Sequence, residues 1–249
     1  MRIIVILYTT TMNTRSLSKR LTIIIPSKNE GIILYNCVQY ISRQNHIDGI
    51  RLIIADISDE EESLQYIRRL QADFKHVLKI IVIKGGYPAQ GRLNGSMLVI
   101  TPYMLFLDAD ILLTNPKIIE GCLNHKKDLV TVPFYTDKPY RWVFRVFDIF
   151  QSISAMIGTP FAVGGFQLWK TETYWSLGGY NPYELFAEDY SISQKVMSKN
   201  FKVVNIEGAY TSSRRFKSKG ILWMFQIMIK SYINRKNPEF FRHHHNYWN

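Results

Sequence analysis

Cysteine is scarce in this chain of 249 residues, which contains only Cys37 and Cys122. Two cysteines exclude a disulfide-rich scaffold, and a chain of this length can bury a full core without such cross-links. No group of cysteines and histidines has the spacing of a zinc finger. So little cysteine favours a reducing compartment. We expect the protein in the cytoplasm, where the inner face of the membrane is a second candidate location.

Long apolar runs are also missing. A membrane-spanning helix needs roughly 18 or more apolar residues. The segments Ile3–Tyr8 and Gly220–Ile233 are both shorter, and the second contains Lys230. The sequence therefore predicts no membrane span and no clear export signal. We interpret residues 1–20 as a loosely attached leader, because a regular pattern begins only at Leu21.

Acidic residues are fewer than basic ones: 31 Lys and Arg against 20 Asp and Glu give a net charge of +11. The excess is concentrated in residues 214–242, which hold eight basic residues and one acid, whereas residues 51–213 are neutral. A basic C-terminal arm on a neutral body indicates an anionic partner, such as substrate phosphates, anionic lipid head groups or nucleic acid. A solvated basic tail is the simpler alternative. No nucleic-acid-binding motif accompanies the charge, so we expect no nucleic acid partner.

Strand-like and helical segments alternate from Leu21 onward. Apolar runs rich in β-branched residues predict strands, and apolar residues at helical spacing predict helices between them. The predicted strands are 21–26, 51–55, 79–84, 103–107 and 129–134, and the predicted helices are 33–41, 60–70, 93–100 and 118–123. This alternation predicts an α/β fold with a mostly parallel central sheet flanked by helices. Leu93, Met97 and Ile100 are expected on one helical face.

Polar clusters follow the first four predicted strands, at 26–30, 56–59, 85–86 and 108–110. Ligands of such sheets bind beyond the carboxyl ends of the strands, so the four clusters should meet at one rim. Asp108 and Asp110 would repel each other there unless a divalent cation lies between them and bridges to substrate phosphates. Hard oxygen ligands favour Mg²⁺ or Mn²⁺. A polar loop without chemistry is the alternative.

Three further groups are candidates for chemistry. Glu188 and Asp189 open a predicted helix, whose dipole would keep a carboxylate ionised near neutral pH, as a general base requires. They would otherwise be simple capping acids. The paired glycines at 164–165 and 178–179 permit sharp turns against a ligand, or mark ordinary loops. Arg214 and Arg215 follow hydroxyl residues and can hold a diphosphate, or are surface charges.

Four segments occur in order between residues 21 and 215: IIIPSKNE, ADISDE, GRLNGSMLVITPYMLFLDAD and GGFQLWKTETYWSLGGYNPYELFAEDYSISQKV. Together they resemble glycosyltransferase family 2. The resemblance implies a GT-A type fold with a nucleotide-binding half (21–110), an acceptor half (111–213) and a basic helical arm (214–249). It implies that the nucleotide-sugar is bound by Pro26, Ser27, Asn29, Glu30, Asp56, Gly91, Arg92, Asp108, Ala109 and Asp110.

The same resemblance implies roles in the reaction. Asp108 and Asp110 would hold Mn²⁺ or Mg²⁺, with Asp110 the more direct ligand, and Asp189 would be the catalytic base. The acceptor or the diphosphate would lie against Gly164, Gly165, Glu188, Arg214 and Arg215. The donor would be linked to UDP or GDP, and the acceptor is not identified.

The sequence also departs from the family pattern. Ala55 and Ile57 replace an Asp and a Gly of the second segment, and Leu93 replaces a frequent Asn, which affects the choice of nucleotide more than the reaction. No Gln-x-x-Arg-Trp motif of processive polymer synthases occurs. We therefore expect transfer of one sugar, by a single displacement that inverts the anomeric centre.

Two apolar segments, 141–157 and 221–233, predict helices that are either packed in a core or laid on a membrane. The adjacent basic arm would favour anionic lipid, so we expect peripheral membrane contact and a lipid-linked acceptor as one hypothesis. Two other function classes compete with the transferase. The first is a non-catalytic relative that binds nucleotide or anionic membrane through its basic arm. The second is a nucleotidyltransferase, for which PSKNE is a poor phosphate loop.

Overall fold

The computed structural model describes residues 16–245, except the side chain of Arg215. Its strands are β1 (Leu21–Ser27), β2 (Ile50–Asp56), β3 (Leu78–Lys84), β4 (Tyr103–Leu107), β5 (Leu112–Leu113), β6 (Leu129–Thr131), β7 (Phe134–Tyr135), β8 (Phe166–Lys170), β9 (Phe201–Val203) and β10 (Ala209–Tyr210). Its α-helices are α1 (Ile32–Ile41), α2 (Glu61–Phe74), α3 (Pro88–Ser96), α4 (Ile118–Leu123), α5 (Arg141–Met156), α6 (Thr171–Ser176), α7 (Glu188–Ser193), α8 (Arg214–Lys219), α9 (Ile221–Ile233) and α10 (Pro238–Phe241).

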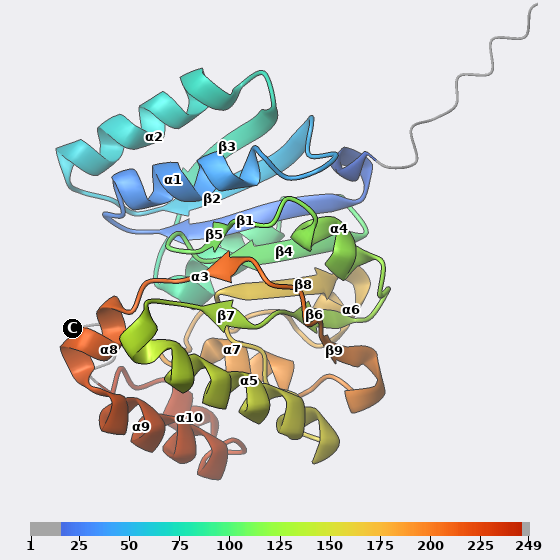
Figure 1. Cartoon of the computed structure of the whole chain (residues 1–249), viewed down its shortest axis with the longest axis vertical. Coiled ribbons are helices and arrows are strands. Elements are labelled where there is room, and N and C mark those ends of the chain that lie inside the picture. The colour runs from blue at the N-terminus through green and yellow to red at the C-terminus, as the bar shows by residue number, and fades with distance from the viewer. Residues whose placement is uncertain (1–15, 246–249) are drawn as a thin grey trace, which may run out of the picture.

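The central sheet has the strand order β3-β2-β1-β4-β8-β6-β9 (Figure 1). Strands β3, β2, β1 and β4 run parallel, β8 is antiparallel to both of its neighbours, and β6 and β9 are parallel. A small second sheet has the order β5-β10-β7. The predicted α/β architecture with a mostly parallel central sheet is confirmed. Because β1, β2, β3 and β4 are parallel, their carboxyl ends lie along one edge.

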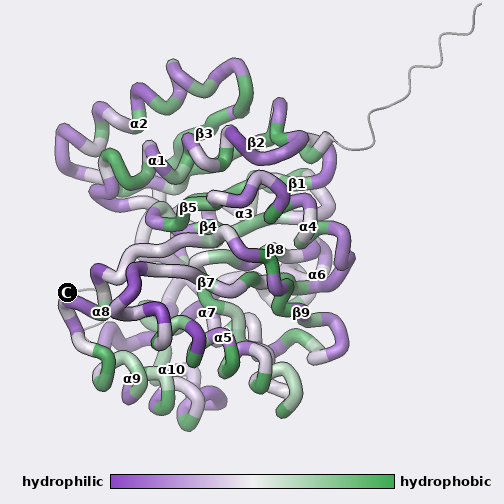
Figure 2. The backbone as a smooth tube through the Cα atoms, viewed as in Figure 1, coloured by the Kyte–Doolittle hydropathy of each residue, from purple (hydrophilic) through white to green (hydrophobic). Residues whose placement is uncertain are grey.

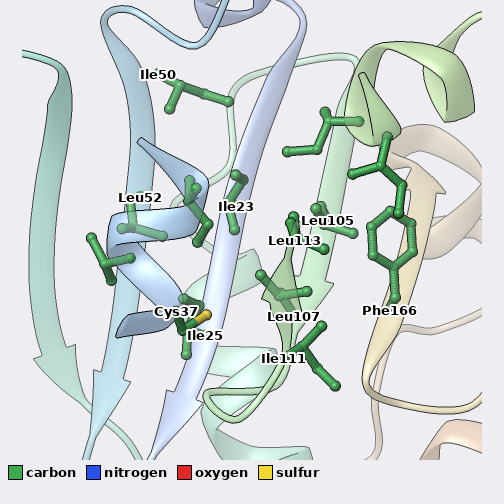
Figure 3. Packing of buried hydrophobic residues seen from close by; sticks show 14 of the residues in the cluster. Ile23, Ile25, Cys37, Ile50, Leu52, Leu105, Leu107, Ile111, Leu113 and Phe166 are labelled. Atoms are coloured by element: carbon green, nitrogen blue, oxygen red, sulfur yellow. The ribbon is translucent and has the colours of Figure 1, made fainter. Parts of the chain in front are cut away.

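Both faces of the central sheet are buried, which explains why its strands are apolar without alternation. Ile23, Ile25 and Leu52 point to one face and join a core with Cys37 of α1 (Figure 3). Ile24, Ile53, Met104 and Phe106 point to the other face, where Trp169, Tyr174 and Tyr180 cover them. Figure 2 shows the apolar strands at the centre and polar segments along the outer helix α2.

The predicted apolar face of helix 93–100 is wrong. Helix α3 ends at Ser96, and Met97 and Ile100 are 69% and 79% exposed. The inner face of α3 consists of small residues instead, because the helix lies very close to the sheet. A Cβ on Gly95 would stand 2.4 Å from Cγ2 of Ile24. Only glycine permits this approach, so the pattern of large apolar residues points away from the true contact.

The predicted strand 129–134 is also corrected. It divides into β6 and β7, which belong to different sheets. Pro133 lies between them, and proline cannot donate a ladder hydrogen bond within a central strand. The division turns the chain toward the edge of the sheet, so that Phe134 reaches the site described below.

The described parts of both chain ends pack against the body. The predicted leader falls mostly outside the described residues. Of its described end, Leu17 is buried in the core, and its amide donates to the carbonyl of His46 at 3.0 Å. The arm folds as α8, α9 and α10 beside α5 (Figure 1). Phe241 anchors it, since its carbonyl accepts from the amides of Leu185 (2.8 Å) and Phe186 (3.2 Å). Within residues 16–245, no helix is long and apolar enough to cross a bilayer.

Candidate active site

The loops after β1 and β2 are tied together at the rim of the sheet. Asn29 has a left-handed backbone (φ 52°), which Asn tolerates better than most residues. Its amide donates to the hydroxyl of Ser58 at 2.8 Å, and its side-chain Nδ2 donates to Asp59 at 2.7 Å. Asp56 accepts from the backbone amide of Ser58 at 3.0 Å and from its hydroxyl at 2.8 Å. Asn29 thus holds the two loops together, and Asp56 fixes the shape of the loop after β2.

Arg92 is the buried centre of the site. It extends from α3 and is 2% exposed. One guanidinium nitrogen donates to Oδ1 of Asp108 at 2.6 Å, and another donates to Oε1 of Glu188. Its guanidinium carbon lies 5.4 Å from the ring centroid of Tyr180. Burial opposes the charge, but the nearby Asp108, Tyr180 and Glu188 raise the pKa of Arg92 well above its ordinary value.

This arrangement changes the interpretation of the Asp108–Asp110 pair. The sequence predicted that a divalent cation removes the penalty of their repulsion. In the structure, Arg92 already compensates the charge of Asp108, so the two acids are not equivalent. Asp110 instead faces Arg214, whose Nη2 lies 3.6 Å from Oδ2 of Asp110 and 3.2 Å from Oε2 of Glu30. Glu30, Asp110 and Arg214 therefore form one charged group at the start of the arm.

Asp189 is held by backbone geometry. Ala187, just before α7, has a left-handed backbone (φ 46°, ψ 34°), which costs free energy for a residue other than glycine. This turn directs Asp189 toward Gly164, whose amide donates to Oδ2 of Asp189 at 2.7 Å. The amide of Tyr190 donates to Oδ1 at 2.8 Å. A Cβ on Gly164 would lie 2.8 Å from Arg92 Nη2 and 3.3 Å from Asp189 Oδ2, so only glycine fits there without displacement.

The pKa of Asp189 is raised to about 7 by burial and by the negative charge of Glu188. Arg92 and the amides of Gly164 and Tyr190 oppose this rise. The sequence predicted that the dipole of the helix keeps this carboxylate ionised near neutral pH. Burial raises its pKa instead, so that about half of it is ionised near pH 7. A carboxylate with a pKa near 7 is a stronger base than an ordinary aspartate, which suits proton abstraction.

One cavity of about 370 Å³ joins these groups. Asp110 and Asp189 both line it, together with Arg92, Asp108 and Glu188. The rest of its wall is mostly aromatic and aliphatic, and comes from α5, α8, α9 and the loops around Phe161 and Phe186. Polar side chains also line it: Thr211, Ser212, Arg214, Ser218, Lys219 and Ser231. The arm thus forms one side of the cavity that contains the acids.

A divalent cation fits this donor set only when a substrate completes it. Within residues 16–245, no three His, Cys, Asp or Glu side chains gather as metal ligands. Asp108 already accepts from Arg92, whereas Asp110 is a carboxylate on the wall of the cavity. Mg²⁺ is commonly held by one or two carboxylates plus substrate phosphates and water. Asp110 with a diphosphate is a donor set of this kind.

The predicted site residues are brought together in two groups. The cavity is lined by Arg92, Asp108, Asp110, Gly164, Gly165, Glu188, Asp189 and Arg214. The second group lies along the neighbouring rim: Ser27 and Asp56 pair in register at the ends of β1 and β2, and a Cβ on Gly91 would meet Pro26 at 3.3 Å. Ala109 is buried beneath the rim. The side chain of Arg215 lies outside the described residues.

Sequence reasoning missed several parts of the site. It did not find the bridge from Arg92 to Glu188, since 96 residues separate them. Nor did it place Tyr180, Ala187 or the aromatic wall at the site. A lone arginine within a helix of small residues was the available signal for Arg92. No local signal marks Ala187, because its strained backbone is imposed by the tertiary fold.

Three solved structures share this architecture. A mannosyltransferase of Pyrobaculum calidifontis, in complex with GDP-Man and Mn²⁺, has a TM-score of 0.63 at 15% identity, covering 85% of this chain and 64% of that one. S. aureus TarS 1–349 with UDP-GlcNAc has a TM-score of 0.58 at 13% identity, covering 78% and 59%. GalNAc-T7 with UDP, GalNAc and Mn²⁺ has a TM-score of 0.55 at 15% identity, covering 78% and 42%. The chain therefore spans less than two thirds of the length of each.

These similarities confirm a GT-A type fold. No curated protein sequence matches the chain. The family model described as "Glycosyl transferase family 2" matches residues 22–178, which include nearly all of β1, β2 to β4, Arg92, Asp108, Asp110 and the glycine pair 164–165. With the fold, the acidic cavity and this match in agreement, the chain belongs to glycosyl transferase family 2.

Proposed function

We propose that the protein is a metal-dependent, inverting glycosyltransferase that moves one sugar from a UDP- or GDP-linked donor to an acceptor hydroxyl. The observation that carries this proposal is the single cavity lined by both Asp110 and Asp189. Asp110 stands at the end of β4, on the nucleotide-binding half, and Asp189 stands on the acceptor half. A donor at one acid and an acceptor at the other would meet inside the cavity.

Asp189 acts on the acceptor in this proposal. Its carboxylate takes the proton of the acceptor hydroxyl, and that oxygen attacks the anomeric carbon of the donor sugar. The bond from this carbon to the diphosphate breaks, and its electron pair leaves with the diphosphate. One displacement inverts the anomeric centre. The amides of Gly164 and Tyr190 fix the direction of the carboxylate during the transfer.

Arg214 and Asp110 act on the donor side. Arg214 is half-exposed at the start of the arm, and its guanidinium can form charge-assisted hydrogen bonds with the leaving diphosphate. A bound Mn²⁺ or Mg²⁺ supplies further positive charge for the diphosphate, with Asp110 as its protein ligand. The Mn²⁺ in the structures of the mannosyltransferase and GalNAc-T7 supports a divalent cation for this chain as well.

Replacement of the base tests the chemistry. Asp189→Asn should lower turnover by on the order of 10²–10⁴, the usual contribution of a general base. Nucleotide binding should stay close to that of the wild type, because the base does not hold the nucleotide. A thermal-shift series with UDP and GDP, with and without Mn²⁺, measures this binding. The matched control is Asp73→Asn, an exposed acid on α2. Near-normal turnover of Asp189→Asn would refute the assignment.

We also propose that the protein contacts a membrane surface through α5 and α9. Their exposed apolar side chains recur at helical spacing: Trp142, Val146, Ile149 and Ile153 on α5, and Leu222, Ile229 and Ile233 on α9. Figure 2 shows both helices side by side at the same end of the molecule. Arg141, Arg145 and Lys230 are exposed on the same helices. Flotation with anionic liposomes tests this contact, and absence of binding at low salt would refute it.

A further inference from the structure

The cavity has an apolar end that the proposed reaction does not use. We infer that this end takes an acyclic apolar chain carried by the acceptor, so that the substrate class is a lipid-like alcohol or glycolipid. The inference rests on the proposed function, since it assumes that the acceptor hydroxyl lies at Asp189.

The wall at this end is built by two helices. Phe144, Phe147 and Phe150 come from α5, and Met224, Ile227 and Met228 come from α9. Ring centroids of Phe147 and Phe225 lie 5.9 Å apart, which shows that the two helices are in contact. An apolar cavity of about 150 Å³ is enough to hold a benzene ring. A cavity of about 370 Å³ leaves room for a longer apolar group beside the acids.

A sugar is a poor occupant for this end. Each hydroxyl of a buried sugar needs a hydrogen-bond partner, and a missing partner costs free energy. The hydroxyl of Ser231, which lies on this wall, already donates to the carbonyl of Ile227 at 2.8 Å. Hydrocarbon needs no such partners, and flexible Met224 and Met228 adapt to its shape.

A continuous aromatic path connects the catalytic end with the apolar end. Tyr190 follows Asp189 directly, and its ring centroid lies 5.5 Å from that of Phe161. Phe161 in turn lies 5.6 Å from Phe150 on α5. Asp189, Tyr190, Phe161 and Phe150 all line the cavity. An acceptor whose hydroxyl meets Asp189 can therefore extend its apolar part along these rings.

The outer faces of the same helices favour a chain over a compact ring. A wall helix that faces water is normally polar on its outer side. Here α5 exposes Ile149 and Ile153, and α9 exposes Leu222 and Ile229. Apolar residues on both sides of the wall allow a chain to pass from the cavity into an apolar phase such as a bilayer. A compact aromatic group would fit within the cavity and would need apolar residues only on the inner face of the wall helices.

Alkyl glucosides below their micelle concentration test the inference, because the head group stays the same while the chain grows. Binding of methyl, hexyl, octyl and phenyl β-glucoside is measured by calorimetry with UDP or GDP and Mn²⁺ present. Each buried methylene should tighten binding roughly fourfold, or about 15-fold from hexyl to octyl. Met228→Glu places a charge on the half-buried wall and should abolish this dependence. Gln226→Glu, which places the same charge at an exposed position of the same helix, should keep it.

The outcomes separate this inference from the proposed function. A chain-length dependence in the wild type and Gln226→Glu, lost in a folded Met228→Glu, supports the apolar site. An equal affinity for hexyl and octyl glucoside overturns it, as does phenyl glucoside binding as tightly as octyl glucoside. Retention of the dependence in Met228→Glu also overturns it. The thermal shift with nucleotide and Mn²⁺ reports on the proposed function alone, because those ligands bind at the acidic end.

Discussion

Arg92→Met removes the positive charge from the buried centre of the site while keeping a flexible side chain of similar length. Arg92 and Glu188 are both almost fully buried, with side-chain exposures of 3% and 6%. Asp108, at 35%, retains much of its hydration. The substitution therefore leaves one buried carboxylate without its partner. It also removes the contact that connects α3 with β4 and α7.

The expected loss of stability follows from that uncompensated charge. Removing one partner of a buried ion pair costs about 3–5 kcal/mol in the free energy of unfolding. Asp108 adds little, because water screens it. The double variant Arg92→Met/Glu188→Gln should regain part of the loss, because no unpaired charge stays buried. Arg68→Met breaks an exposed contact with Glu61 and should cost less than about 1 kcal/mol.

The loss should also depend on pH. In Arg92→Met, loss of the cation should raise the pKa of Asp189, which burial already raises to about 7, still further. A carboxylate with a raised pKa does not destabilise the folded state at low pH, where it is protonated in both states. It destabilises the folded state as the pH increases, because ionisation is easier in the unfolded chain. Urea unfolding at pH 5 and pH 8 should therefore show the larger loss at pH 8. A loss below about 1 kcal/mol at pH 8, or an equal loss at both values, would refute the reasoning.

Four other predictions follow from the same contacts. The value of kcat/KM should fall about tenfold for each pH unit below pH 7, because Asp189 must be ionised and its pKa is raised to about 7. A pH-rate profile with no fall above pH 5 would contradict this. Relative to the wild type, Asp189→Asn should gain stability from pH 4 to pH 8, since a raised pKa destabilises the wild type only above the unfolded value, whereas the loss of one amide contact costs the same at both pH values; urea unfolding at both pH values measures the difference. Gly164→Ala should lower kcat by on the order of 10- to 100-fold by displacing Arg92 or Asp189, with unchanged kcat the refuting result. Phe241→Ala should destabilise the arm by about 3–5 kcal/mol, because it removes a buried ring while the carbonyl contacts remain, and an unfolding measurement within 1 kcal/mol of the wild type would exclude the ring as an anchor.

Much of the structure of residues 21–110 is readable from their sequence. Buried parallel strands are continuous apolar runs, and each run from β1 to β4 is followed at once by polar residues. The order of strands along the chain then predicts that 26–30, 56–59 and 108–110 share one rim, as the register of Ser27 with Asp56 bears out. These features depend on neighbours in sequence, which is why local patterns suffice.

The rest of the chain is less predictable, because its contacts join distant parts of the sequence. The antiparallel strand β8 enters between β4 and β6, and no periodicity reveals that insertion. The apolar segment 221–233 was compatible with a core or with a membrane. The structure gives it both an inner face, on the cavity, and an outer face of exposed apolar residues. Periodicity alone cannot choose, because the segment is apolar on nearly all sides.

The sequence by itself determined the α/β class, the rim of polar residues and the identity of the acids, because strand hydrophobicity and residue chemistry are local properties. Only the tertiary structure decided what those acids can do. It compensated Asp108 with Arg92, raised the pKa of Asp189 by burial beside Glu188, and placed the arm over the cavity. Charge compensation and desolvation depend on the distances between residues from separate elements, and those distances exist only once the chain has folded.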